Sequence, residues 1–281
     1  MRILAPFAKA ARTLRGGPAA IVLIALVICA LFAPLLAPFP YDAMNLPAAN
    51  LEPSAKHWMG TDEFGRDLFS RVLYGARISL GIAVSSMAAS VLIGVIIGGL
   101  AGYFGGWIDR ALMAISDMTW SFPEILIALV LIAIIGPGLG STAVAITVGY
   151  FAQFARLTRA QIIALKGETY IEAARNLGAS DAVILFRHLI PNAMTPVLVA
   201  GMLATGDAII LEATLGFFGL GAQPPLPSWG AIMSSGTAQI FLAPWIILYP
   251  GIVIAITVVS INLFGDALID ALDIRGKVRE G

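Results

Sequence analysis

The sequence has little charge and almost no cysteine. Only 12% of its 281 residues are Asp, Glu, Lys or Arg, while 59% are apolar; soluble domains carry about 25% charged residues. The single cysteine, Cys29, excludes an intrachain disulfide and a metal site built from several cysteines. The formal net charge is zero, so the composition indicates no nucleic-acid partner. Low charge and high apolar content predict an integral membrane protein, with a lipid bilayer around it.

Six stretches are apolar and close to the roughly 20 residues that a membrane-spanning helix needs. They cover residues 18–36, 78–101, 111–135, 141–164, 193–211 and 243–263. A basic tail precedes the first stretch, as in a cleaved signal peptide, but its length and the five later spans favour an uncleaved anchor. The expected fold class is all-α, a multi-pass membrane protein with six transmembrane helices.

The same pattern divides the chain into segments. We expect a tail (1–17), a first transmembrane helix (18–37), a polar loop with short helices near its end (38–77), a five-helix domain (78–270) that includes a charged loop (165–192), and a second tail (271–281).

The basic residues orient the helices, because cytoplasmic loops carry an excess of Lys and Arg. With six spans, both termini lie on one side. That side collects 13 of the 17 basic residues: Arg2, Lys9, Arg12, Arg15, Arg110, Arg156, Arg159, Lys166, Arg175, Arg187, Arg275, Lys277 and Arg279. The other four lie in or next to the 38–77 loop, among five acidic residues, and the loops 136–140 and 212–242 have none. We therefore expect both termini in the cytoplasm.

Small residues recur at every fourth position of the second span. Ser86, Ser90, Gly94 and Gly98 fall on one helix face, where small side chains let two helix backbones approach closely in lipid. We interpret this face as a helix-packing surface; a seam that moves during gating is a compatible alternative. Near the cytoplasmic end of the fourth span, snorkelling to the interface explains the two arginines at 156 and 159.

Several acidic residues lie inside or near the spans. Each costs at least about 2.5–3.5 kcal/mol at the centre of a bilayer, so such residues normally face water or a partner. Our candidates for lining a translocation path are Asp117, Pro123, Glu124 and Glu212. A buried carboxylate that pairs with a neighbouring helix or subunit is the alternative interpretation.

Known catalytic motifs are missing from the sequence. It contains no HExxH, no GxSxG, no phosphate loop ending in Gly-Lys-Ser/Thr and no dinucleotide fingerprint. The two histidines, His57 and His188, fall on opposite expected sides of the membrane and cannot share a site. We therefore expect no catalytic residue in this chain, and the energy for its function must come from elsewhere.

Residues 168–192, ETYIEAARNLGASDAVILFRHLIPN, are the longest charged interruption in the second half of the chain. Residues 168–177 can form a helix, Gly178 allows a backbone conformation closed to other residues, and residues 179–181 offer N-caps for a second short helix through Arg187. Pro191 is expected to end that element before the fifth span. Such a helix pair suits insertion into a partner's groove; an interfacial amphipathic loop is the alternative.

This segment resembles the EAA loop of ABC importer permeases. The matching residues are Glu172-Ala173-Ala174, then Gly178 after three residues, and Leu-Ile-Pro at 189–191. The general pattern ends in Ile-x-Leu-Pro, and the departure here is like that of the dipeptide/oligopeptide/nickel subfamily. Further stretches resemble the C-type member of such permease pairs: HWMGTDEFGRD at 57–67, LYGARISL at 73–80, GFFGLGAQPP at 216–225, PSWG at 227–230 and NLFGD at 262–266.

The resemblance implies the transmembrane-domain fold of a type I ABC importer in a bacterial inner membrane. It implies a second (B-type) permease subunit, two cytoplasmic ATP-binding subunits that hold ATP and Mg, and an extracytoplasmic substrate-binding protein. The chain itself would hold no cofactor or metal and would not be an enzyme. ATPase coupling would fall to Glu168, Glu172, Ala173, Ala174, Gly178, Arg187 and Pro191.

The function expected from the resemblance is import of di- and oligopeptides or peptide-like solutes. Nickel chelates, glutathione or another small solute are alternatives within the same architecture. An ion-coupled carrier or channel that uses Asp117 and Glu124 is the alternative of a different class, although the sequence shows no repeated halves. An intramembrane enzyme is a third hypothesis, but the sequence shows no nucleophile–base pair that would support it.

Overall fold

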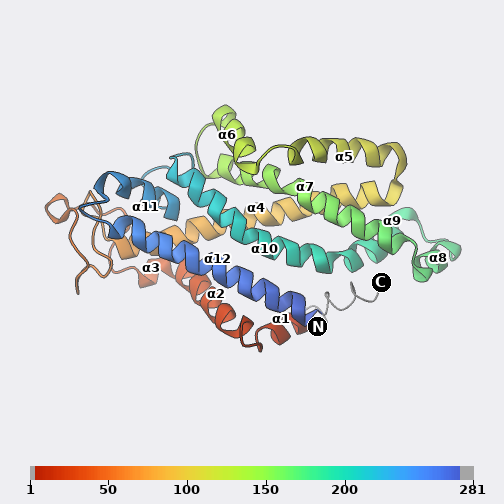
Figure 1. Cartoon of the computed structure of the whole chain (residues 1–281), viewed down its shortest axis with the longest axis horizontal. Helices are drawn as coiled ribbons and strands as arrows, with labels where there is room; N and C mark the ends of the chain where they lie inside the picture. Colours follow the sequence, from red (N-terminus) through yellow and green to blue (C-terminus); the bar gives the residue numbers. More distant parts are fainter. Residues whose placement is uncertain (1–3, 273–281) are drawn as a thin grey trace. The chain divides into compact units, whose positions relative to one another are not determined.

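The computed structural model describes residues 4–272 (Figure 1). The basic residues at 2, 275, 277 and 279 lie outside the described residues. Of the expected C-terminal tail, 271–281, only the first two residues are described. Within the described range, regular structure is helical apart from one isolated bridge between Thr61 and Asp67, which confirms the all-α prediction. The elements are α1 (Leu4–Ala10), α2 (Gly16–Leu31), α3 (Ala33–Leu36), η1 (Leu46–Ala48), α4 (Leu68–Phe104), α5 (Gly106–Trp120), α6 (Glu124–Ile135), α7 (Leu139–Lys166), α8 (Thr169–Asn176), α9 (Asp181–Val183), η2 (Ile184–Leu189), α10 (Ile190–Phe217), α11 (Trp229–Gly236), η3 (Thr237–Gln239) and α12 (Trp245–Ala271).

Among the described residues, three helical segments are long and apolar enough to cross a membrane: Leu68–Phe104, Asp181–Phe217 and Trp245–Ala271. The pair α5 and α6 makes a fourth if it is one broken span. α2 is apolar but has only 16 residues, and α7 has 28 residues but includes polar and charged ones. Each expected span coincides with helical structure, while the count of six transmembrane helices stays a prediction.

The expected third span is not one straight helix. α5 ends at Trp120, α6 begins at Glu124, and their axes differ by 91°. Pro123 has no N–H to continue the helix and restricts the residue before it. Ser121 closes α5, because its N–H and its hydroxyl both donate to the Asp117 carbonyl, at 3.0 and 2.7 Å. The proline therefore separates two helices where the sequence led us to expect one.

The second span begins earlier than residue 78, at Leu68, so helix α4 includes the last residues of the expected 38–77 loop. The carboxylate of Asp67 explains this start. Its Oδ2 accepts bonds from the Ser70 N–H (2.8 Å) and the Ser70 hydroxyl (2.7 Å), which satisfies a backbone donor of the first turn as an N-cap does.

The described chain forms two compact units, the first of which contains the segments up to Val84, Ile132–Ala143 and from Thr205 onward. In this unit α12 packs along α2 and α11, and α1 contacts the far end of α12 (Figure 1). Trp229, the first residue of α11, is fully buried and donates its indole N–H to the Val72 carbonyl of α4 at 3.1 Å. The first helices, α1 and α2, and the last long helix, α12, thus belong to one packed unit.

The loop before α4, also in the first unit, is held by buried charges. Asp62 is fully buried and lies between two arginines, 2.7 Å from Arg66 Nε and 3.3 Å from Arg71 Nε. The ring of His57 lies 2.9 Å from Asp67 through Nδ1. This charge network gives the loop a defined shape, although it has little regular secondary structure.

The second unit contains Ser85–Leu131 and Val144–Ala204. Here the small residues of α4 pack against α7. A Cβ at Gly94 would lie 2.5 Å from the Phe154 Cβ, and one at Gly98 would overlap the backbone carbonyl of Ala155. Ser90 donates its hydroxyl to the Ser86 carbonyl (2.9 Å) and to the Thr147 carbonyl on α7 (3.1 Å). The two backbones come this close because the stripe of small residues leaves no side chain between them.

Candidate functional site

The segment after α7 folds into a short helix that ends in a glycine turn. α8 stops at Asn176, and Gly178 adopts a φ of +83°. The Gly178 N–H bonds the Arg175 carbonyl at 3.0 Å, and the Ala179 N–H bonds the Ala174 carbonyl at 3.1 Å. This pair of bonds is a Schellman motif, which closes helices at a residue in the left-handed region. The turn that the sequence predicts at Gly178 is therefore present.

The second short helix starts at the expected N-cap. Ser180 precedes α9, and its hydroxyl accepts a bond from the Val183 N–H at 3.5 Å. α9 then continues through a π-helical turn, η2, directly into α10, so that Asp181–Phe217 is one uninterrupted helical segment.

The prediction that Pro191 ends this element is wrong. Pro191 is the second residue of α10 and lies inside the continuous segment Asp181–Phe217, directly after the π-helical turn. The wider π-turn supports it: the Ile190 N–H bonds the Leu185 carbonyl five residues back, as π-helices do. The Asn192 side chain also donates to the His188 carbonyl at 2.7 Å.

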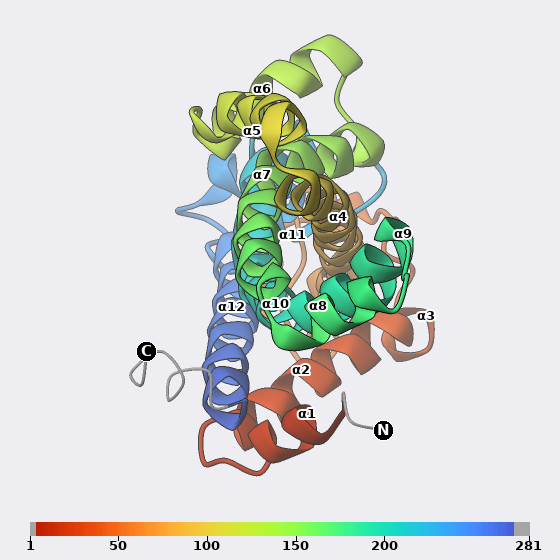
Figure 2. The same ribbon diagram turned by 90° about the vertical axis from the view of Figure 1, so that its right-hand side faces the viewer.

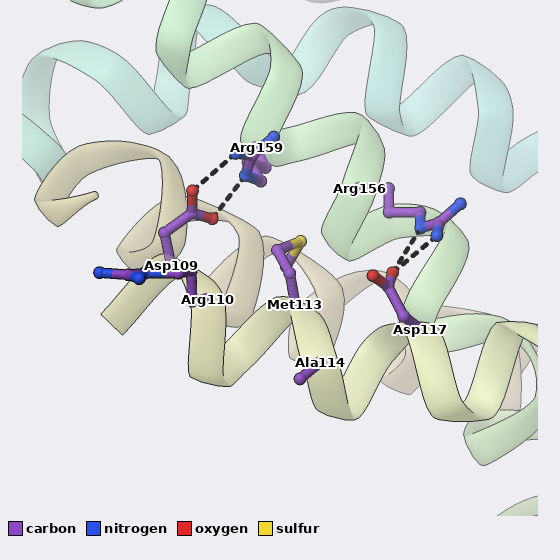
Figure 3. A pocket seen from close by; sticks show the side chains of 7 residues that line it. All are labelled: Asp109, Arg110, Met113, Ala114, Asp117, Arg156 and Arg159. Carbon is purple, nitrogen blue, oxygen red and sulfur yellow. Dashed lines mark hydrogen bonds and ion pairs between the residues drawn. The ribbon is translucent and has the colours of Figure 1, made fainter. Parts of the chain in front are cut away.

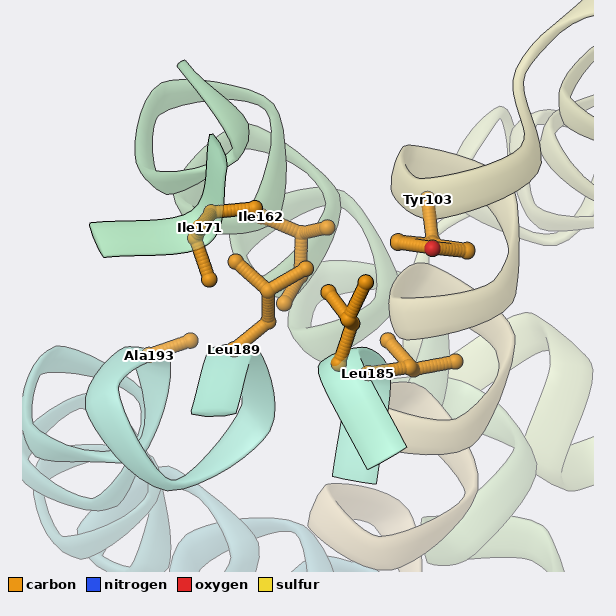
Figure 4. Packing of buried hydrophobic residues seen from close by; sticks show 7 residues of the cluster. Tyr103, Ile162, Ile171, Leu185, Leu189 and Ala193 are labelled. Carbon is orange, nitrogen blue, oxygen red and sulfur yellow. The ribbon is translucent and has the colours of Figure 1, made fainter. Parts of the chain in front are cut away.

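The inner side of α8 is fixed by an apolar cluster, which we call the coupling core (Figure 4). Ile171 of α8 is fully buried in it. The other members come from four elements that are far apart in the chain. They are Tyr103 of α4, Ile162 of α7, Ile184, Leu185 and Leu189 of η2, and Ala193 of α10. Ile171 therefore joins α8 to the ends of three long helices, α4, α7 and α10.

Polar contacts add to the coupling core. The Tyr103 hydroxyl donates to Asp181 at the start of α9, at 2.5 Å. Lys166, the last residue of α7, donates to the Tyr103 carbonyl and places its ammonium group 5.4 Å from the centre of the Tyr103 ring. One tyrosine of α4 thus contacts the end of α7 and the start of α9, the elements on either side of α8.

The outer side of α8 is open. Glu172, Ala173 and Gly178 are exposed, Ala174 is half-buried, and Leu177 is 88% exposed. A Cβ at Gly178 would meet nothing within 4 Å. Figure 2 looks toward α8 and α9, at the ends of α7 and α10. An apolar side chain and a bare turn at this tip offer a surface for another protein.

The two remaining coupling candidates flank this surface. Glu168 is exposed and precedes α8; its backbone carbonyl accepts a bond from the Ile171 N–H at 2.9 Å, while its side chain does not cap the helix. Arg187 is exposed on η2 and lines a shallow, open hollow of about 550 Å³ with Phe186 and Pro191.

The path candidates are in different surroundings. Asp117 forms an ion pair with Arg156, 2.6 Å from its Nη2. Pro123 is at the α5–α6 bend, and exposed Glu124 begins α6, with its Cβ 3.2 Å from where a Cβ at Gly149 would lie. Glu212 is fully buried, and its carboxylate lies near the hydroxyls of Ser79 and Ser228 without a hydrogen bond of standard geometry among the described residues.

The sequence interpretation missed the partners of the α7 arginines. Arg159 binds both carboxylate oxygens of Asp109, at 2.5 and 2.6 Å, and Arg156 binds Asp117 (Figure 3). Snorkelling is therefore an incomplete explanation for these arginines. The signal available in the sequence was the presence of two aspartates, Asp109 and Asp117, at or near the start of one expected span and of two arginines near the end of the next.

Comparisons with known proteins identify the family. Residues 94–277 match the family described as binding-protein-dependent transport system inner membrane component, and residues 19–53 match the N-terminal TM domain of oligopeptide transport permease C. The dipeptide transport system permease protein DppC of Alkalihalophilus pseudofirmus is 41% identical over 275 residues, which are 96% of this chain and 90% of that protein. The glutathione transport system permease protein GsiD of Pectobacterium atrosepticum is 44% identical over 237 residues, covering 83% and 79%.

A solved structure supports the fold. A chain of the MetNI methionine ABC transporter in an inward-facing conformation superposes with a TM-score of 0.59 at 23% identity, over 73% of this chain and 97% of that one. The predicted type I ABC importer transmembrane fold is thereby confirmed. The chain is a multi-pass inner-membrane protein that belongs to the family of binding-protein-dependent transport system inner membrane components.

Proposed function

We propose that this chain is a permease subunit of an ATP-driven importer for di- and oligopeptides or peptide-like solutes, and forms half of its translocation path. Relatives that are more than 40% identical are named for dipeptide and for glutathione transport. Both are peptide-like compounds with amide bonds and charged ends. Glutathione is therefore the second candidate substrate, beside ordinary short peptides.

The proposed complex needs several other chains. A second permease completes the path, two cytoplasmic ATP-binding subunits hold ATP and Mg²⁺, and an extracytoplasmic binding protein delivers the solute. The excess of Lys and Arg on one side supports a cytoplasmic position for both termini and for residues 165–192. The loop held by Asp62 and Arg66 would then face the binding protein.

The coupling core is the observation that carries the proposal. α8 has eight residues, too few to be a stable helix in isolation, so its position depends on the burial of Ile171. Its outer side, with Leu177 and Gly178, would sit in a groove of one ATPase, and Glu172 would make polar contacts there. When ATP draws the two ATPases together, the movement of α8 would pass through the coupling core into α4, α7 and α10.

The full complex in proteoliposomes, with its binding protein, tests this proposal. Gly178→Arg puts a large charged side chain into the open space on the docking surface, so we expect loss of ATP-driven tri-alanine uptake. Gly105→Arg is the matched control, because Gly105 also has a positive φ (+66°) and open space around a Cβ, but precedes α5. Gly105→Arg imposes at least as much backbone strain, because Gly105 combines a φ of +66° with a ψ of −156°, a region that only glycine adopts readily. Loss of uptake in Gly178→Arg but not in Gly105→Arg therefore reports on docking.

Two outcomes would contradict the proposal. The first is normal uptake with normal binding-protein-stimulated ATPase activity in the Gly178→Arg complex. The second is uptake by the purified chain alone, driven by a pH gradient and indifferent to ATP. That second result would favour an ion-coupled carrier in which Asp117 and Glu124 act.

A further inference from the structure

A pocket of about 530 Å³ lies between α5 and α7 of the second unit (Figure 3). Its size is within the ordinary range for small-molecule sites. Five of its seven lining residues are charged: Asp109, Arg110, Asp117, Arg156 and Arg159. The other two, Met113 and Ala114, lie on α5 between the two aspartates, and Met113 stands between the two ion pairs in Figure 3.

The two ion pairs of the pocket differ in exposure. The Asp109–Arg159 pair is bidentate and its carboxylate side chain is 18% exposed. In the other pair, Arg156 donates from Nε (3.0 Å) and Nη2 (2.6 Å) to one oxygen, Oδ1, of Asp117. Both side chains of that pair are about half exposed, at 45% and 52%. The Asp109 pair holds α5 against α7, while the Asp117 pair is open to a ligand.

The position of the open pair shows what the pocket faces. Asp117 follows Asp109 by eight residues of α5, which corresponds to about 12 Å along a helix. An exposed pair of charges this far into an expected span cannot face hydrocarbon, because ionisable side chains there turn toward water or a protein partner. The pocket therefore opens on the water-filled path or on a subunit that lines it.

The charges of the pocket select the class of ligand. Three guanidinium groups and two carboxylates leave one positive charge in excess, and Arg110 has a single bond of 3.3 Å to the Gly106 carbonyl within its own helix. Arginine binds carboxylates through parallel N–H donors. A carboxylate that meets Arg110 or Arg156 and an ammonium group that meets Asp117 would satisfy both signs at once.

We propose that this pocket binds the charged termini of a zwitterionic short peptide on the cytoplasmic half of the path, an inference that rests on the proposed function. The free oxygen, Oδ2, of Asp117 receives the peptide ammonium group, and Arg110, toward the other end of the pocket in Figure 3, receives the terminal carboxylate. Met113 lies under the middle of the ligand, where its flexible thioether adapts to different side chains. An anionic lipid headgroup fits less well, because two carboxylates line the same pocket.

A single-cysteine complex tests the pocket directly. Cys29→Ser removes the native thiol, and Ala114→Cys places a new one on the pocket lining. The complex of permeases and ATPases, without the binding protein, is treated in nanodiscs with a charged thiol reagent. With tri-alanine at about ten times its Kd, only about one site in eleven is free, so labelling should slow by about tenfold.

The controls separate charge recognition from simple blockage. N-acetyl-tri-alanine amide has neither terminal charge and should leave the labelling rate unchanged. Met118→Cys, 71% exposed and outside the pocket lining, should be labelled at the same rate with and without tri-alanine. Asp117→Asn combined with Arg156→Gln should abolish protection of Cys at position 114.

Several results would overturn the inference. These are no protection by tri-alanine, equal protection by the capped peptide, or slowing that follows phosphatidylglycerol content instead of peptide. If the complex takes up peptide with ATP but tri-alanine does not protect the cysteine at position 114, only the proposal of peptide binding in this pocket is refuted. If tri-alanine protects the cysteine at position 114 in a complex that takes up no peptide, the proposed transport function is refuted, while peptide binding in the pocket stands.

Discussion

Ile171→Ala is the sharpest test of how α8 is connected to the membrane helices. Ile171 is fully buried in the coupling core, between α7, η2 and α10. Truncating a buried isoleucine to alanine costs about 2–5 kcal/mol. A loss of about 3 kcal/mol lowers the ratio of docked to undocked α8 by roughly 150-fold. Because α8 is too short to persist alone, an undocked α8 cannot pass a movement to α4, α7 and α10.

The assay measures coupling and local structure together. In proteoliposomes, the number of peptides imported per ATP hydrolysed should fall for Ile171→Ala, and amide exchange in α8 should become faster. Ile171→Val costs only about 0.5–1.5 kcal/mol. Its ratio of imported peptide to hydrolysed ATP and its rate of amide exchange in α8 should therefore lie between those of Ile171→Ala and the wild type. Leu177→Ala, at an 88% exposed position, should leave exchange in α8 unchanged and weaken retention of the ATPase during purification.

One combination of results would refute the reasoning. If α8 exchanges faster in Ile171→Ala while the ratio of imported peptide to hydrolysed ATP is normal, the coupling core does not transmit movement. If neither quantity changes, Ile171 does not hold α8 in place.

Three further substitutions have expected outcomes. Gly98→Val should separate α4 from α7 and lower the thermal unfolding midpoint. The reason is that a Cβ at this position would overlap the Ala155 carbonyl, and overpacking costs about 1–3 kcal/mol of stability. An unchanged midpoint would contradict the close approach of the two helices. Tyr103→Phe removes the bond to Asp181 and should cost about 0.5–1.5 kcal/mol, seen as faster amide exchange at α9; protection equal to the wild type would show that the ring alone holds the turn. Glu212→Gln should leave the unfolding midpoint unchanged or raise it, because the carboxylate is fully buried and an amide avoids burying a charge; a clear drop would show that the carboxylate is needed.

Local chemistry made part of the structure predictable. Apolar runs of about 20 residues predicted where the helices lie, because a segment in lipid must satisfy its own backbone hydrogen bonds, as an α-helix does. The glycine at 178 and Ser180 predicted the turn and the cap of the next helix, because each acts through backbone atoms within a few residues. All of these features depend on short stretches of sequence.

Features that depend on distant residues were out of reach. The Tyr103–Asp181 bond joins positions 78 residues apart, and no local pattern pairs them. The partners of Arg156 and Arg159 required the register between α5 and α7, which is set by packing. Pro123 allowed either a kink or a full break, and only the structure shows the 91° bend. The continuation of the helix through Pro191 depended on a π-turn, which has no sequence signature.

The composition of the coupling core sets a rule for exchanging parts between related permeases. Residues 165–192 alone would arrive in a new host without Tyr103 and Ile162, which form the walls against which Ile171 packs. A graft intended to accept a foreign ATPase should therefore carry with it the ends of α4 and α7 that contain Tyr103 and Ile162. The unit that can be transplanted is discontinuous in sequence, and its boundaries are those of a packed cluster.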